Sequence, residues 1–266
     1  MDSDKKGVTD GSKEVNKMAD FSELGQELVR LLRLKISPVG IKLFPKLGDI
    51  PEGFEVIDAV CPVCQVIGKA RYHETAVATT RDAATACGLG GAVLGFYDVA
   101  PDVADGTRNV GVWAKTVEAT KKLAQDRMML KKGAFEAFGV APLTTMNIEP
   151  DVIQVWGTPV QMLQLVYAHI WDGSDNVQLS TNGHGASCYE ALVVPYLTGK
   201  IRLAIADIGD RRFAYAADDE MITGFPFADL ERITMNLRES YSGAYKYPYA
   251  YHMFPIWEGA LERCKA

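Results

Sequence analysis

The sequence predicts an α/β fold in which a mixed sheet with flanking helices forms a single large domain, with a division into two lobes left open. Three observations point to this fold. The chain has 266 residues, enough to bury about three-quarters of its unfolded surface without disulfide bonds. Hydrophobic residues make up 48% and charged residues 23%, as in ordinary globular domains. Segments with helical periodicity alternate with short strand-like segments, which is typical of an α/β sheet.

The domain is expected to span residues 21–240. Residues 1–20 mix Lys, Asp, Ser and Gly without any period and predict a mobile tail. Residues 241–266 are rich in tyrosine and predict a C-terminal strap. Tyrosine combines a large apolar face with a polar tip, which suits an interface or a pocket lid. We expect such a role, and with it a homo-oligomer; packing of the strap on its own subunit is the alternative.

In the first half of the domain, four segments have a clear pattern. Leucines at helical spacing behind Ser22 predict a helix over 22–32 with Ser22 as its cap. Residues 39–44 alternate like a strand. A proline at the second position favours a helix over 61–73, because the missing N–H costs nothing there. Residues 116–138 predict a long amphipathic helix.

The second half alternates more regularly. A turn with a capping Thr158 and a proline after it predicts the start of an apolar helix. A further helix carries Cys188. The expected order is a strand over 151–156, a helix over 160–171, a strand over 177–180, the Cys188 helix, a strand over 201–208 and a last helix near 228–240.

Composition and charge exclude several classes of protein. The net charge of −6 argues against a nucleic-acid partner, because such proteins carry a basic face. No apolar run approaches the roughly 20 residues needed to cross a bilayer, and the N-terminus lacks the apolar core of a signal peptide. The five cysteines are odd in number and too sparse for a disulfide scaffold. We therefore expect a cytoplasmic protein whose thiols are free or bind metal.

Four short blocks between residues 36 and 235 carry a family resemblance. They are Cys64–Ala70, Cys87–Gly95, Glu149–Val152 with Pro159-x-Gln161-Met162, and Gly185–Glu190 with Gly209-x-Arg211. Their order and spacing resemble the ArCR family, an uncharacterised family of archaea and anaerobic bacteria. The resemblance implies that Cys64, Cys87 and Cys188 match the recurrent cysteines of that family. It implies no activity.

The cysteines are the first candidates for chemistry. Cys61 and Cys64 lie at an expected helix start, where unpaired N–H groups favour a thiolate and lower its pKa. Cys87 precedes a glycine-rich stretch, and Cys188 follows a turn into its own helix. Cysteines at such junctions between loops and helices are well placed to converge on one site. Three thiolates with one open position would hold a four-iron (4Fe-4S) cluster with one iron free for substrate. Cys61 would be the fourth ligand if the cluster is closed.

Three other interpretations of the cysteines remain open. Zinc would be held by three cysteines with His184 in a tetrahedral site. Cys61 and Cys64 would instead form a redox-active pair. The thiols would otherwise be unreactive core residues, since cysteine packs as a small apolar side chain.

Neighbouring residues complete the candidate site. His184 titrates near neutral pH and is a candidate acid, base or ligand. Glu190 and one of Arg211 and Arg212 are candidate substrate contacts, because an arginine fork suits carboxylates. The glycines of the second block could cradle an anion or a cluster edge, but they lack the context of a nucleotide-binding fingerprint. These glycines are Gly88, Gly90 and Gly91.

These features together predict a cytoplasmic iron–sulfur enzyme of anaerobic metabolism, a lyase or a reductase, that acts on a small organic substrate. Its cluster would be held by Cys64, Cys87 and Cys188. A non-catalytic accessory protein that binds zinc or another ligand is the alternative, as is a thiol–disulfide redox protein that uses Cys61 and Cys64.

Overall fold

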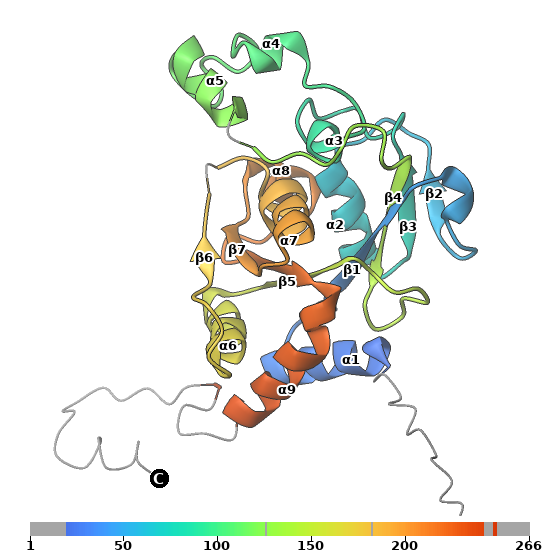
Figure 1. Ribbon diagram of the computed structural model, residues 1–266, viewed down its shortest axis with the longest axis vertical. Coiled ribbons are helices and arrows are strands. Elements are labelled where there is room, and N and C mark those ends of the chain that lie inside the picture. Colours follow the sequence, from blue (N-terminus) through green and yellow to red (C-terminus); the bar gives the residue numbers. More distant parts are fainter. Residues whose placement is uncertain (1–19, 126, 182, 242–246, 249–266) are drawn as a thin grey trace, which may run out of the picture.

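The computed structural model of the chain describes residues 20–125, 127–181, 183–241 and 247–248 (Figure 1). Apart from Asp20, the expected N-terminal tail lies outside the described residues. So does nearly all of the expected tyrosine-rich strap, including Cys264. The homo-oligomer expected from that strap stays a prediction.

Eight strands among the described residues form one mixed sheet in the order β2-β3-β4-β1-β5-β8-β7-β6. The pairs β2–β3 and β6–β7 are parallel, and the other neighbouring pairs are antiparallel. The predicted mixed α/β sheet is thus confirmed. The strands are β1 (Val39–Phe44), β2 (Glu55–Ile57), β3 (Val77–Thr80), β4 (Ala137–Pro142), β5 (Val152–Gly157), β6 (Gln178–Leu179), β7 (Arg202–Ile205) and β8 (Met221–Pro226).

One face of the sheet is covered by three helices that lie together at the bottom of Figure 1. Each helix contributes to one buried cluster with Ile153 and Phe225 of the sheet. The three helical residues are Leu28, Leu165 and Ile233, one from each helix. The apolar stripe on each helix is thereby removed from water, which is the main stabilisation of such packing. The helices are α1 (Phe21–Leu32), α6 (Pro159–Ile170) and α9 (Leu230–Tyr241).

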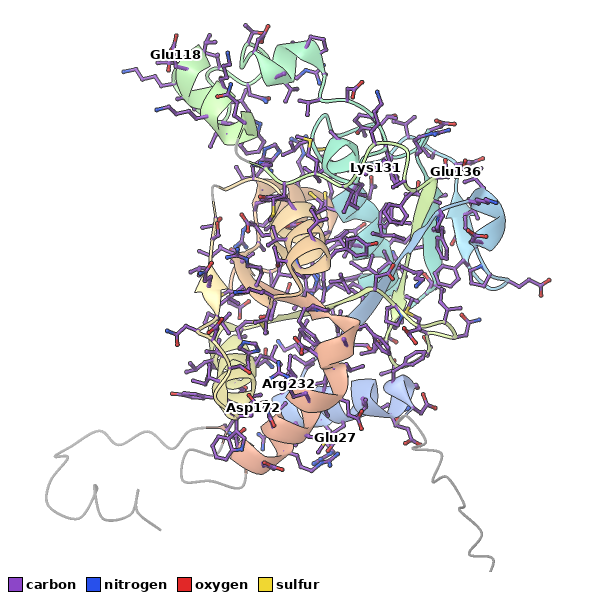
Figure 2. All side chains as sticks on the ribbon, viewed as in Figure 1. Glu27, Glu118, Lys131, Glu136, Asp172 and Arg232 are labelled. Atoms are coloured by element: carbon purple, nitrogen blue, oxygen red, sulfur yellow. The ribbon has the colours of Figure 1, made fainter. Side chains whose placement is uncertain are left out.

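Polar contacts between these helices set which residues face each other. Glu27 of α1, which is labelled in Figure 2, accepts a hydrogen bond of 2.9 Å from Arg238 Nε of α9. The Arg238 contact holds the pKa of Glu27 below its ordinary value. Such an exposed pair contributes little stability, so the buried leucines and isoleucines carry the packing and the ion pair fixes its register. Asp20, rather than the expected Ser22, caps α1 by accepting from the Ser22 N–H at 2.9 Å.

The opposite face carries the helices that will matter for the site. Alternation along β5 separates the two faces, because Val152 and Trp156 belong to the cluster beneath these helices while Ile153 and Val155 belong to the α1 side. The elements of this face are α2 (Val63–His73), α3 (Gly90–Val93), the π-helix η2 (Ala186–Val193), α7 (Val194–Thr198) and α8 (Ile208–Phe213).

Two short helices, α4 (Pro101–Ala104) and α5 (Val117–Gln125), form an excursion that stands at the top of Figure 1. Two single 3₁₀ turns, η1 (Leu47–Asp49) and η3 (Phe227–Asp229), complete the described elements. Among the described residues, no helix combines the length and the apolar character that crossing a membrane requires.

One predicted element is wrong over much of its length. The helix expected over 116–138 ends with α5 at Gln125, and Ala137 already begins β4. Gly133 stands at a φ of 73°, a left-handed conformation that interrupts a helix. Strand β4 is paired with β3 on one side and β1 on the other and is buried along its whole length. A strand buried on both faces shows no polar alternation, so its sequence resembles a helix segment.

Candidate functional site

A pocket of about 340 Å³ lies between the start of α2, the 86–89 loop, the start of η2 and α8. Cys64, Cys87 and Cys188 all line it. The three predicted ligand cysteines, which are far apart in the sequence, therefore meet at one place. His184, at the turn before η2, lines the same pocket.

Cys64 enters the pocket from the first turn of α2. Gly209 of α8 lies against it, because a Cβ on that glycine would stand 3.7 Å from Cys64 Sγ. Burial raises the pKa of the Cys64 thiol well above its ordinary value, and the carboxylates of Asp210 and Asp207 raise it further. The expected lowering of this pKa by the helix start is therefore wrong, since desolvation and nearby negative charge outweigh the N–H groups.

Cys87 is held at the edge of the pocket by its own loop. The Gly90 N–H donates to Cys87 Sγ at 3.4 Å. Tyr97 Oη lies 2.7 Å from the Cys87 carbonyl oxygen and 2.9 Å from that of Ala84, so its hydroxyl donates to this loop. Gly91 packs on Tyr97, where a Cβ would meet the ring at 2.4 Å. Of the three predicted cradle glycines, only Gly88 lines the pocket; Gly90 and Gly91 serve the packing beneath it.

Cys188 lies in the first turn of the π-helix η2 and is only 6% exposed. The Gly185 carbonyl accepts hydrogen bonds of 3.0 Å from both the Tyr189 and the Glu190 N–H. This wide turn is the i→i+5 pattern, which recurs at functional sites. Gln154 of β5 donates to the Ser187 carbonyl at 2.7 Å, which ties the turn to the sheet. Burial and the charges of the other thiols and carboxylates raise the pKa of Cys188.

Two buried aspartates at the start of α8 hold the η2 turn in place. Asp207 accepts from the N–H groups of Gly185 and, at 2.9 Å, Ala186. Asp210 accepts from the Ser187 hydroxyl and, at 3.3 Å, from the Ser187 N–H. Burial and the neighbouring charge of Asp207 raise the pKa of Asp210 to about 7. The same two residues form the capping box of α8, so one pair of carboxyl groups caps the beginnings of both α8 and η2.

Replacing Asp207 with alanine is expected to lower the free energy of unfolding by about 2 kcal/mol. Three backbone N–H groups, those of Gly185, Ala186 and Asp210, would lose their acceptor. Urea unfolding measures this loss. Asp218→Ala removes an exposed carboxylate paired with Arg211 and should change stability by less than about 0.5 kcal/mol. Equal stability of the two variants would contradict the capping role.

His184 is stacked on Trp113 of the α4–α5 excursion, with ring centroids 4.6 Å apart and an interplanar angle of 16°. Its backbone carbonyl accepts from Arg127 Nη2 at 2.9 Å. Burial and the charge of Arg127 hold the pKa of His184 below its ordinary value. The imidazole is therefore neutral near neutral pH.

The two arginines of α8 point to different places. Arg211 Nη1 donates to the Ala217 carbonyl at 2.7 Å and pairs with Asp218 at 3.4 Å, outside the pocket. Arg212 lines the pocket. Arg108 of the excursion lines it from the other side and pairs with Asp102 at 2.7 Å. The open choice between Arg211 and Arg212 thus falls on Arg212 by position.

Five predicted site residues do not line the pocket: Arg211, Gly90 and Gly91, described above, and Glu190 and Cys61. Glu190 is buried and accepts from Ser180 Oγ at 3.3 Å, and burial raises its pKa. Cys61 is buried in the core next to Thr79, and burial raises its pKa too. Among the described residues, no three His, Cys, Asp or Glu side chains stand so that they could hold a metal ion as they are.

Sequence reasoning missed four residues that shape this pocket. Asp207 and Asp210 were detectable as the Asp-x-x-Asp pattern of a capping box before a helix. Trp113 and Arg127 carried no local signal, because they reach His184 from segments 71 and 57 residues away in the sequence.

Comparison with known proteins finds one family and one relative, both described as uncharacterised. Residues 27–236 match the family model described as uncharacterised ArCR. An uncharacterized protein of Methanocaldococcus jannaschii is 26% identical over 215 residues, which cover 80% of this chain and 92% of that protein. No solved structure matches.

Proposed function

The chain belongs to the uncharacterised ArCR family, and we propose that it is an iron–sulfur enzyme that acts on a small organic anion. Cys64, Cys87 and Cys188 would hold a 4Fe-4S cluster in the pocket between α2, η2 and α8. The observation that carries the proposal is the meeting of these three thiols, from three separate elements, at one pocket. The same proposal includes that the enzyme is cytoplasmic and acts in anaerobic metabolism.

The residues around the thiols fit such a group. Thiolates are the usual ligands of iron–sulfur clusters, and the N–H of Gly90 on Cys87 Sγ is the kind of contact that tunes them. Zinc held by these thiols and His184 is the alternative, and metal analysis distinguishes the two.

If Cys64, Cys87 and Cys188 hold a four-iron cluster, one iron would stay open, and the cluster would supply Lewis-acid or electron-transfer chemistry. The chain's own residues do the rest. Arg212 and Arg108 line the pocket and bind the anionic end of the substrate. His184, kept neutral by burial and Arg127, accepts a proton from the substrate. Trp113 covers His184 and excludes water from it.

Both reaction classes expected from the sequence, a lyase and a reductase, fit this proposal. A lyase would use the cluster as a Lewis acid and His184 as the proton acceptor, whereas a reductase would use the cluster to deliver electrons. We therefore propose addition, elimination or reduction at a small carboxylate-bearing substrate.

Anaerobic purification followed by iron and sulfide analysis and a visible spectrum tests the proposal. The expected result is about four irons and four sulfides per chain, the content of such a cluster, with brown colour. Stoichiometric zinc without iron would instead support the accessory-protein alternative. A protein without metal whose activity depends on Cys61 and Cys64 alone would support thiol–disulfide exchange. Either result overturns the cluster.

A further inference from the structure

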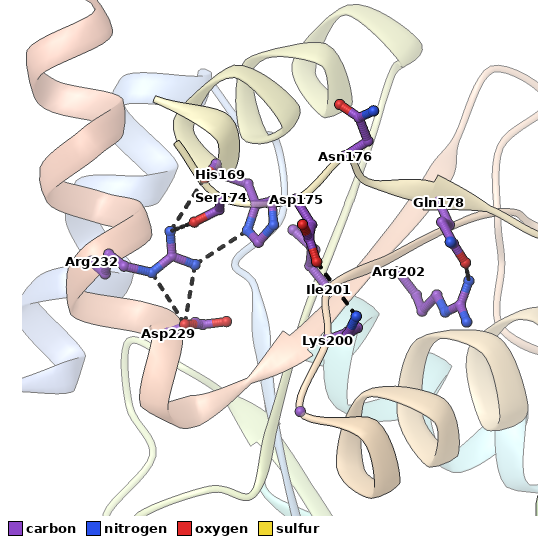
Figure 3. A pocket seen from close by; sticks show the side chains of 11 residues that line it. His169, Ser174, Asp175, Asn176, Gln178, Lys200, Ile201, Arg202, Asp229 and Arg232 are labelled. Atoms are coloured by element: carbon purple, nitrogen blue, oxygen red, sulfur yellow. Dashed lines mark hydrogen bonds and ion pairs between the residues drawn. The ribbon is translucent and has the colours of Figure 1, made fainter. Parts of the chain in front are cut away.

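A second cavity, of about 550 Å³, lies away from the three cysteines (Figure 3). It is bounded by the end of α6, the loop that follows it, the paired starts of β6 and β7, and α9. Three cationic side chains line it, against two carboxylates. The cations are Lys200, Arg202 and Arg232, and the carboxylates are Asp175 and Asp229.

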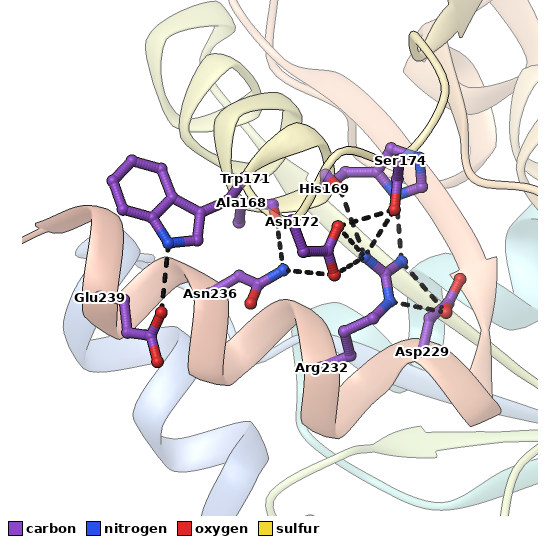
Figure 4. Close-up of polar contacts among 9 residues, drawn as sticks. All are labelled: Ala168, His169, Trp171, Asp172, Ser174, Asp229, Arg232, Asn236 and Glu239. Atoms are coloured by element: carbon purple, nitrogen blue, oxygen red, sulfur yellow. Dashed lines mark hydrogen bonds and ion pairs between the residues drawn. The ribbon is translucent and has the colours of Figure 1, made fainter.

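Arg232 is fully engaged within the protein (Figure 4). Its guanidinium pairs with Asp229 at 3.1 Å and with Asp172 at 3.2 Å, and it also reaches Ser174 Oγ at 3.2 Å. Asn236 adds a hydrogen bond of 3.1 Å to Asp172. This arginine therefore joins α9 to the end of α6 and has little capacity left for a ligand.

His169 is also satisfied and adds no charge. Its Nδ1 lies 3.2 Å from Arg232 Nη2, which can only donate, so Nδ1 accepts. Burial and the charge of Arg232 hold the pKa of His169 below its ordinary value. The imidazole is therefore neutral near neutral pH.

Arg202 differs from Arg232 in its partners. Its Nη1 donates to Gln178 Oε1 at 2.7 Å, across the β6–β7 pair. Its Nε is buried and has no hydrogen-bond partner among the described residues. Gln178 is neutral, and no described carboxylate lies within ion-pair distance of Arg202, although the charges of Glu190 and Arg202 interact over a longer distance. The other terminal nitrogen, Nη2, makes no hydrogen bond to a described residue, and an anion in the cavity would supply its acceptor.

Lys200 stands beside Arg202 in the turn before β7. It pairs with Asp175 at 3.5 Å, and both side chains are largely exposed. Such an exposed pair is weak, so the ammonium can exchange Asp175 for a ligand. Figure 3 shows Lys200 between the Arg232 cluster and Arg202.

We propose that this cavity is a binding site for a small oxyanion, a carboxylate or a phosphate, held by the guanidinium of Arg202 and the ammonium of Lys200. The planar fork of arginine pairs with two oxygens of either group, and lysine adds a point charge. Gln178 orients the fork, and Arg232 keeps the far wall in place.

Calorimetric titration with sodium phosphate and, separately, with sodium succinate tests this site at constant ionic strength. Wild-type protein is expected to bind at least one of the two, and which one binds identifies the head group. Arg202→Gln should weaken binding by about tenfold or more, the loss of a charge-assisted contact. Lys200→Gln should weaken it less, because its ammonium is exposed.

Arg81→Gln is the matched control, since Arg81 is an exposed arginine in a surface pair with Asp82. It should bind as the wild type does. Arg202→Lys keeps the charge but not the fork, so intermediate binding is expected. This variant tests the site if Arg202→Gln does not fold. Binding of neither anion, or equal binding by the Arg202 and Arg81 variants, overturns the site. Because the cavity is separate from the cysteines, Cys188→Ala should bind the anion unchanged, whatever becomes of the cluster.

Discussion

Replacing Cys188 with alanine is expected to abolish the iron and sulfide content of the anaerobically purified protein, together with its visible absorbance. Cys188 is nearly buried and lines the pocket with Cys64 and Cys87. With one of three ligands gone, the remaining two thiolates cannot hold a four-iron cluster. Cys64→Ala and Cys87→Ala should have the same effect. Iron and sulfide analysis with a visible spectrum measures the loss.

Cys61→Ala is the matched control. Its thiol is buried in the core and does not line the pocket, so the variant should keep its cluster. Far-UV circular dichroism checks that each variant is folded. Loss of the cluster in Cys61→Ala alone would show that the proposed ligands are wrong. Unchanged metal content in Cys188→Ala would contradict the proposed cluster site. Activity that is lost in Cys61→Ser but kept in Cys87→Ser would point to the redox pair.

Gly224→Ala is expected to destabilise the protein by about 3 kcal/mol, the upper end for an overpacked core. A Cβ on Gly224, in the middle of β8, would stand 2.0 Å from the Ala191 carbonyl oxygen and 2.6 Å from its Cα. Both are backbone atoms of η2, so no side chain can move aside. The helix would have to lift from the sheet, and Cys188 moves with it.

Urea unfolding at constant pH measures this effect. Gly48→Ala is the control, because a Cβ there meets nothing within 4 Å. That variant should differ from wild type by less than about 0.5 kcal/mol. If the two variants proved equally stable, the close approach of β8 and η2 would not be the contact that positions Cys188. A metal content that falls in Gly224→Ala but not in Gly48→Ala would link the packing to the site.

Local sequence patterns were sufficient for many of the elements. The alternation over 39–44 matches β1, and the leucine spacing before it matches α1 to within a residue. The turn at Thr158 and Pro159 begins α6 as expected, with Gln161 accepting from the Thr158 N–H at 2.8 Å. These predictions are correct because a helix cap or a one-sided apolar stripe depends only on neighbouring residues. The prediction is wrong at β4, because a strand buried on both faces has no one-sided apolar pattern.

The candidate site divides in the same way. The family resemblance singled out Cys64, Cys87 and Cys188, and their places near expected loop ends led to the proposal that they converge. Spacing alone could not separate Cys61 from Cys64, which are three residues apart but differ in whether they line the pocket. Nor could it choose Arg212 over Arg211, because adjacent residues on a helix point in different directions.

Those choices depend on contacts between distant segments. Gly224 brings η2 onto the sheet, and a Cβ on Gly68 would stand 2.3 Å from the Cα of Ala214, so the end of α8 packs closely on α2. Asp207 then sets the first turn of η2 from α8. None of these contacts leaves a periodic or capping signal in the segment it positions, because each depends on the shape of a surface formed elsewhere in the chain. The family resemblance could therefore nominate three thiols, while long-range packing placed them around one pocket and left Cys61 in the core.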